Sequence, residues 1–158
     1  MIEFISSILA GIVIAGVTAF ITVNLSLKRF REERWWERRA AAYENVIEAL
    51  HHSKAFSGVH MDAELERRKV PEERDKELRA KSAQAHREID RATDMAGFLL
   101  GCEARDRLRK YHQDTSDAGR ADSWHEYLQL DWDVTNSCLK DLIEIARKDL
   151  KTGAREKA

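Results

Sequence analysis

The chain has 158 residues, enough for one compact domain beside a short terminal segment. One proline and seven glycines supply too few turn residues for a sheet protein, and charged residues at 35% favour long, solvated helices. The formal net charge of −1 argues against a basic, nucleic-acid-binding protein, so no nucleic-acid partner is expected.

The first predicted element is an apolar helix over residues 4–23, a stretch without a charged residue. Twenty helical residues cover about 30 Å, the thickness of a bilayer's hydrocarbon core. The first three residues include no Lys or Arg, unlike the start of a signal peptide, and the basic residues follow the apolar stretch. By the positive-inside rule, residues 1–27 form a retained anchor of a single-pass protein in the bacterial inner membrane, with the N-terminus outside and the C-terminal domain in the cytoplasm.

Small residues recur at every fourth position of this anchor: Ser7, Gly11, Ala15 and Ala19. In lipid, small side chains let two helices approach closely and make van der Waals contact. This face therefore predicts self-association of the anchor and a homo-oligomeric protein.

Residues 28–39 form a predicted basic juxtamembrane helix. Its six bases are Lys28, Arg29, Arg31, Arg34, Arg38 and Arg39. These bases are expected to set the orientation and to contact anionic membrane lipids, although interleaved acids reduce the local charge.

Neither Pro nor Gly occurs between residues 23 and 55, so the helix is expected to continue from the anchor into the soluble part. Apolar residues then recur at spacings of four and three, and Trp35, Trp36 and Tyr43 are predicted to pack this helix against the bundle. Gly58 is the predicted stop signal, and residues 57–70 are expected to form a connection.

Pro71 is predicted to open a second helix, which Gly101 ends. A shorter helix follows, then a turn over residues 114–123, and Ser123 with Glu126 forms a capping box at the start of the last helix. The predicted fold is all-α: a transmembrane helix that continues into a cytoplasmic antiparallel bundle of three long helices and one short, over residues 40–151. Residues 152–158 are expected to be a frayed tail.

Few residues suggest a catalytic or metal-binding site. Glu48 and His51 have the spacing of di-metal sites in helical bundles, but the nearest second pair is Asp122 with His125 at a helix start. We therefore expect no metal and no cofactor. Asp131 and Asp133 are expected to be solvated, because neighbours two apart on a helix face different ways. Cys102 and Cys138 lack a metal-ligand spacing and are expected to be reduced.

The stretch FREERWWERRAAAYENVIEAL, residues 30–50, resembles the segment after the membrane helix in a group of small bacterial membrane proteins of unassigned function with an FxxERWWER motif. The ending ARKDL, residues 146–150, is similar to the end of those chains. The resemblance implies a bacterial, membrane-anchored helical protein and implies no activity.

The function predicted from the sequence is therefore a non-catalytic, membrane-anchored interaction or scaffold protein that binds itself or another protein. One alternative is an oligomeric pore or membrane-perturbing effector of the toxin or phage-defence type, gated by the cytoplasmic bundle. The other is a metal-dependent bundle enzyme that uses Glu48 and His51.

Overall fold

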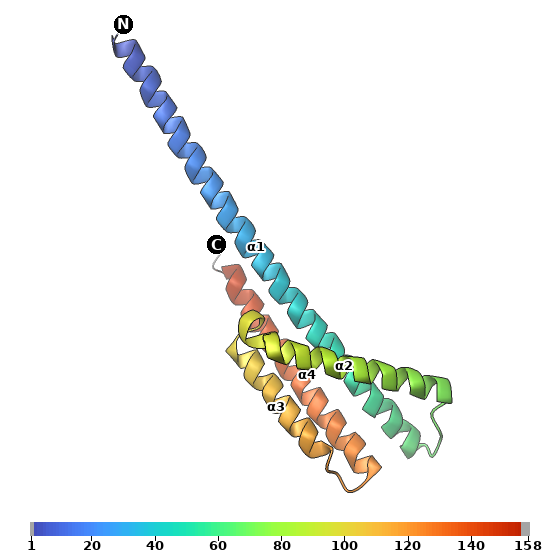
Figure 1. Cartoon of the computed structure of the whole chain (residues 1–158). Helices are drawn as coiled ribbons and strands as arrows, with labels where there is room; N and C mark the ends of the chain where they lie inside the picture. Colours follow the sequence, from blue (N-terminus) through green and yellow to red (C-terminus); the bar gives the residue numbers. More distant parts are fainter. Residues whose placement is uncertain (1, 156–158) are drawn as a thin grey trace. The chain divides into compact units, whose positions relative to one another are not determined.

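A computed structural model describes the backbone of residues 2–155 and the side chains of residues 16 and 18–151. The described residues form four helices and no strand, which confirms the predicted all-α class (Figure 1). The helices are α1 (Ile2–Leu65), α2 (Glu72–Leu99), α3 (Cys102–Ala118) and α4 (Trp124–Arg155). The chain divides into two compact units, Met1–Glu37 and Arg38–Ala158, which are described in turn.

The first unit is helical from Ile2, and its described large apolar side chains are exposed. Its polar side chains bond to the helix itself: the Thr22 hydroxyl donates to the Thr18 carbonyl at 2.8 Å, and the Asn24 amide donates to the Phe20 carbonyl at 3.1 Å. These local bonds leave the apolar side chains as the main features of this surface.

The structure corrects the predicted membrane anchor. Among the residues that were described, no helix is long and apolar enough to cross a membrane. This finding overturns the predicted single-pass localisation in the inner membrane, whereas the pore alternative stays a prediction. The side chains of residues 4–15, the rest of the predicted anchor, lie outside the described part.

The second unit is an antiparallel helical bundle. Contacts between α1 and α4 join residues whose numbers rise along α1 and fall along α4: Tyr43 with Asp149, Lys54 with Asn136, and Glu64 with His125. Arg39 meets Leu99 and His60 meets Asp75, so α2 is antiparallel to α1 as well. In Figure 1, α3 and α4 run side by side while α2 passes obliquely across the bundle.

The core of the bundle draws on all four of its helices. Its fully buried large side chains include Leu50 of α1, Ile89 of α2, Leu108 and Tyr111 of α3, and Leu142 of α4. Each of these residues has apolar neighbours at three- and four-residue spacing, which is the pattern of a buried helix face.

Helix α1 continues beyond the predicted stop signal, to Leu65. Gly58 lies inside the helix, where a Cβ atom would sit 3.5 Å from the Trp132 ring. Phe56, Ser57 and Ala63 are buried on the same stretch. The glycine therefore lets α4 approach closely and does not end α1, because tertiary packing outweighs its weak helix propensity.

The other helix boundaries follow local signals. Pro71 precedes α2 as predicted, and Gly101 separates α2 from α3 with a φ of 91°, a conformation that favours glycine. Helix α3 runs to Ala118, several residues into the predicted turn. At the start of α4 the Ser123 hydroxyl accepts a hydrogen bond from the Glu126 amide at 3.2 Å, whereas the Glu126 side chain accepts one from the Asp122 amide at 3.1 Å.

Candidate interaction surfaces and a buried polar cluster

The N-terminal apolar surface is a set of exposed apolar side chains among the described residues of the first unit. Its six members are between 46% and 71% exposed: Phe20, Ile21, Val23, Leu25, Leu27 and Phe30. Exposed apolar residues gathered in this density typically mark a surface that another molecule covers. Ala19, of the predicted association face, is exposed in the same region, whereas the side chains of Ser7, Gly11 and Ala15 lie outside the described residues.

The basic residues that follow are largely solvated and interact with neighbouring acids. Lys28 lies 3.9 Å from Glu32, and Arg34 lies 4.0 Å from Glu37. In the second unit, Arg39 donates a hydrogen bond to the Leu99 carbonyl at 3.0 Å, which ties α1 to the end of α2. The predicted contact of this basic segment with lipid head groups stays a prediction.

The three aromatic residues predicted to join helix and bundle have different surroundings. Tyr43 is buried, and its hydroxyl lies 2.8 Å from the Leu100 carbonyl and 2.6 Å from Asp149. Burial, and then the Asp149 carboxylate, raise the pKa of Tyr43 well above its usual 10. Trp35 and Trp36 are each more than one-third exposed. Tyr43 thus links α1, the end of α2 and α4 through one hydroxyl.

The α1–α2 groove is a cavity of about 780 Å³ in the second unit. It is lined by Arg38, Ala41, Ala42, Asn45, Glu48 and His52 of α1, by Lys81, Gln84, Ala85, Glu88, Arg91, Ala92, Met95, Phe98 and Leu99 of α2, and by Leu100. The space exists because alanines stand on both helices where larger side chains would have filled it. Ala85 and Ala92 of α2 are among the alanines that line this groove.

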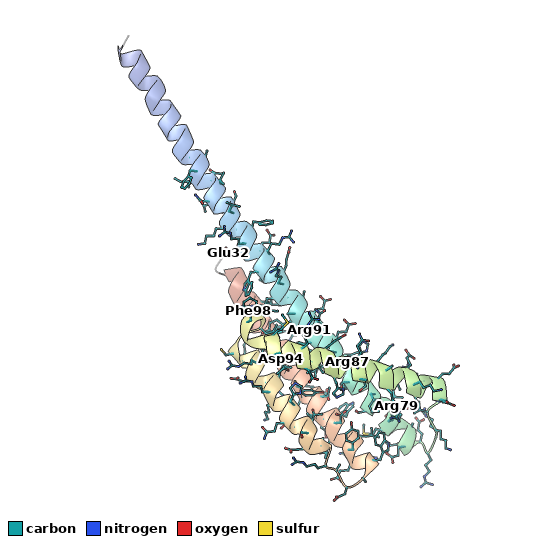
Figure 2. All side chains as sticks on the ribbon, viewed as in Figure 1. Glu32, Arg79, Arg87, Arg91, Asp94 and Phe98 are labelled. Carbon is teal, nitrogen blue, oxygen red and sulfur yellow. The ribbon has the colours of Figure 1, made fainter. Side chains whose placement is uncertain are left out.

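The groove combines an apolar end with rims of mixed charge. Met95 and Phe98 lie near one end of α2 and are 41% and 70% exposed; Phe98 and Arg91 are labelled in Figure 2. Glu48 and Arg91 place opposite charges on the two helices. Such a lining offers apolar contact along its length and polar contacts at its edges.

The buried polar cluster lies inside the bundle. Its members are Ser53, Ser57, Tyr111, Asp131 and Thr135, all with 1% exposure or less. The Ser57 hydroxyl donates a hydrogen bond to one oxygen of Asp131. Within the described part of the chain, the second Asp131 oxygen and the hydroxyls of Ser53, Tyr111 and Thr135 form no hydrogen bond of acceptable geometry. The bundle therefore keeps a costly polar centre where apolar packing would be expected.

Burial raises the pKa of Asp131, an effect that the Ser57 hydrogen bond and the nearby His86 partly offset. The same burial raises the pKa of Tyr111. The prediction that Asp131 is solvated is wrong, whereas Asp133 is exposed. A signal was present in the sequence, because Leu128, Asp131 and Thr135 are spaced by three and four residues, the pattern of a buried helix face.

The metal-site candidates do not come together. Glu48 and His51 are both exposed, and Glu48 lies 3.7 Å from His52, one helical turn away. Among the described residues, no group of three or more His, Cys, Asp or Glu side chains could hold a metal ion. The cysteines are both free, Cys102 exposed and Cys138 buried, and burial raises the pKa of the Cys138 thiol to about 12.

Comparisons with known proteins add no relative. The chain matches no family model, no curated protein and no solved structure. The resemblance of residues 30–50 to small bacterial membrane proteins stays a prediction.

Proposed function

We propose that this protein is a non-catalytic interaction module that binds an amphipathic helix of a partner protein in its α1–α2 groove. The observation that supports the proposal most directly is the open, alanine-floored groove between two helices of an otherwise packed bundle. Helix-in-groove binding is a recurrent mode of recognition, in which apolar residues on one face of the bound helix occupy a hydrophobic groove.

The length of the groove favours a helix as its occupant. From Arg38 to His52 the lining extends along about 21 Å of α1, which corresponds to about four turns of a parallel or antiparallel third helix. The floor of Ala41, Ala42 and Ala92 permits close approach of a bound helix and leaves room for its large apolar side chains.

The chemistry of the lining defines the partner further. Exposed Met95 and Phe98 offer an apolar anchor at one end, and methionine adapts readily to different side chains. Both signs of charge stand on the rims, with Glu48 and Glu88 beside Lys81 and Arg91. The partner helix is therefore expected to carry leucine- or phenylalanine-sized residues at spacings of three and four, bordered by residues of both charges.

The proposal is tested by selecting helical peptides from a displayed library against the full chain. Selected peptides are expected to share apolar residues at positions i, i+3 or i+4, and i+7, and to bind the wild-type protein in solution. The variant Ala41→Phe, which fills the groove from an exposed position, should weaken their binding at least tenfold. Isothermal titration calorimetry with the selected peptides measures the loss.

The matched control is Ala83→Phe, which adds the same ring at an exposed position of α2 outside the groove lining. It should leave binding unchanged. The proposal is wrong if no helical peptide is enriched, or if the two variants weaken binding equally. Circular dichroism of each variant checks that the bundle remains folded.

A further inference from the structure

We propose that residues 20–30 of α1 form a parallel, in-register coiled coil with the same segment of a second copy of the chain, through the face of the N-terminal apolar surface that carries Phe20, Val23, Leu27 and Phe30. This surface is separate from the α1–α2 groove, and the inference does not depend on what the groove binds.

The spacing of the exposed apolar residues supports a coiled-coil seam. Phe20, Val23, Leu27 and Phe30 follow one another at intervals of three, four and three residues. These are the a and d positions of the heptad repeat, which form the contact line when two helices wrap around each other. All four side chains are at least 46% exposed, and the helix continues without a break through this stretch.

A second copy of the chain fits this face because two identical rows of side chains can pack against each other. Four large side chains in one line along a helix leave no hollow that a differently shaped partner would fill. Two such lines bury each other by knobs-into-holes packing. Isologous contacts of this kind are the commonest way in which soluble proteins associate.

The distribution of charge selects the parallel orientation. The seam is uncharged up to Leu27, whereas residues 28–37 contain four bases and three acids. An antiparallel pair would lay this charged half against the apolar half of the other copy, which costs desolvation. A parallel pair joins like halves, and because the charged half is nearly balanced its self-repulsion is small.

The test compares two leucines that differ in face but not in type. Leu27 lies on the seam, and Leu25, which is exposed to a similar degree, lies about 200° away around the helix. Sedimentation analysis of the full chain in detergent-free buffer should show a dimer. Leu27→Asp should raise its dissociation constant at least about 100-fold, since it places a carboxylate in the seam, whereas Leu25→Asp should leave the dimer intact.

The orientation is tested by cross-linking in a Cys102→Ser background, which removes the exposed native thiol. With Val23→Cys, mild oxidation by copper–phenanthroline should join two copies, because a parallel pair brings the two residues 23 together. Leu25→Cys should stay uncross-linked. An antiparallel pair would instead bring position 23 opposite position 27, and a failed Val23→Cys cross-link in an intact dimer would overturn the parallel arrangement.

Two outcomes would reject self-association altogether. One is a wild-type monomer at micromolar concentration; if that monomer sediments with phosphatidylcholine vesicles, lipid and not a second copy covers the apolar surface. The other is an equal response of the dimer to Leu25→Asp and Leu27→Asp. Neither outcome affects peptide binding in the α1–α2 groove, so failure of this inference is distinguishable from failure of the proposed function.

Discussion

The two halves of α1 contain the same kinds of apolar residue in opposite settings. Leu25 and Leu27 of the first unit are about half exposed, whereas Leu50 of the second unit is fully buried in a cluster that all four helices of the bundle supply. Helical periodicity alone does not separate the two halves. A buried leucine contributes to the stability of the chain that contains it, whereas an exposed one is available to another molecule.

The largest expected effect tests this contrast directly. Leu50→Ala should lower the free energy of unfolding of the bundle by about 2–5 kcal/mol, because it removes buried apolar contacts and leaves a cavity. Leu25→Ala makes the same change on an exposed part of the same helix and should shift stability by no more than about 0.5 kcal/mol. Urea denaturation of the full chain measures both. Equal effects would mean that exposure does not separate the two halves.

A second pair extends the contrast to the backbone. Gly101→Ala should destabilise the bundle by about 1–3 kcal/mol, because a φ of 91° is strained for any residue with a Cβ atom. Gly97→Ala lies inside α2, where the added methyl group meets only Arg105 at an ordinary 3.6 Å. It should stabilise the protein by about 0.5–1 kcal/mol through helix propensity. Thermal denaturation should therefore show shifts of opposite sign, and shifts of one sign would contradict the assigned backbone conformation.

A third test concerns a buried polar contact. Tyr43→Phe removes the hydroxyl that lies within hydrogen-bond distance of the Leu100 carbonyl and Asp149. It should lower the free energy of unfolding by about 1–2 kcal/mol, because buried acceptors lose their donor. Tyr127→Phe is the control, since burial and nearby charges, and no hydrogen bond, act on the Tyr127 hydroxyl in the described part of the chain. A comparable loss in the control would show that ring packing, and not the hydroxyl, is affected.

The last test concerns the buried carboxyl group of Asp131, whose effect on the free energy of unfolding should increase with pH. The pKa of Asp131 is raised in the folded state, so the folded protein holds this proton more tightly than the unfolded chain does. The stability that comes from this proton is complete below the unfolded pKa of about 3.9 and is lost as pH rises towards the folded pKa. Asp131→Asn removes this loss, and its stability relative to wild type should rise as pH increases above about 4.

Asp133→Asn provides the reference, because Asp133 is the exposed neighbour two residues along α4. Its unfolding free energy should follow the wild-type pH profile. Denaturant titrations at several pH values measure all three proteins. A pH-independent difference between Asp131→Asn and wild type would contradict the raised pKa, and it would show that Asp131 is ionised at little cost.

The sequence by itself determined most of the local structure. The helical class followed from few turn residues and regular apolar spacing. Pro71, Gly101 and Ser123 marked boundaries because their effects on φ, backbone donors and caps are local. Tyr43 was recognisable as a core position, since periodicity identifies the face that a helix buries.

Tertiary structure determined which residues of different helices pack together, and no local sequence pattern shows this. Gly58 stays inside α1, where Trp132 packs against it, and Asp131 is buried together with the four other members of the buried polar cluster. The α1–α2 groove depends on alanines from two helices that only the fold brings together. The apolar N-terminal stretch had indicated a membrane helix, a prediction that the described helices overturn. Periodicity shows which side chains a helix buries, but only the packed structure shows which other residues of the chain bury them.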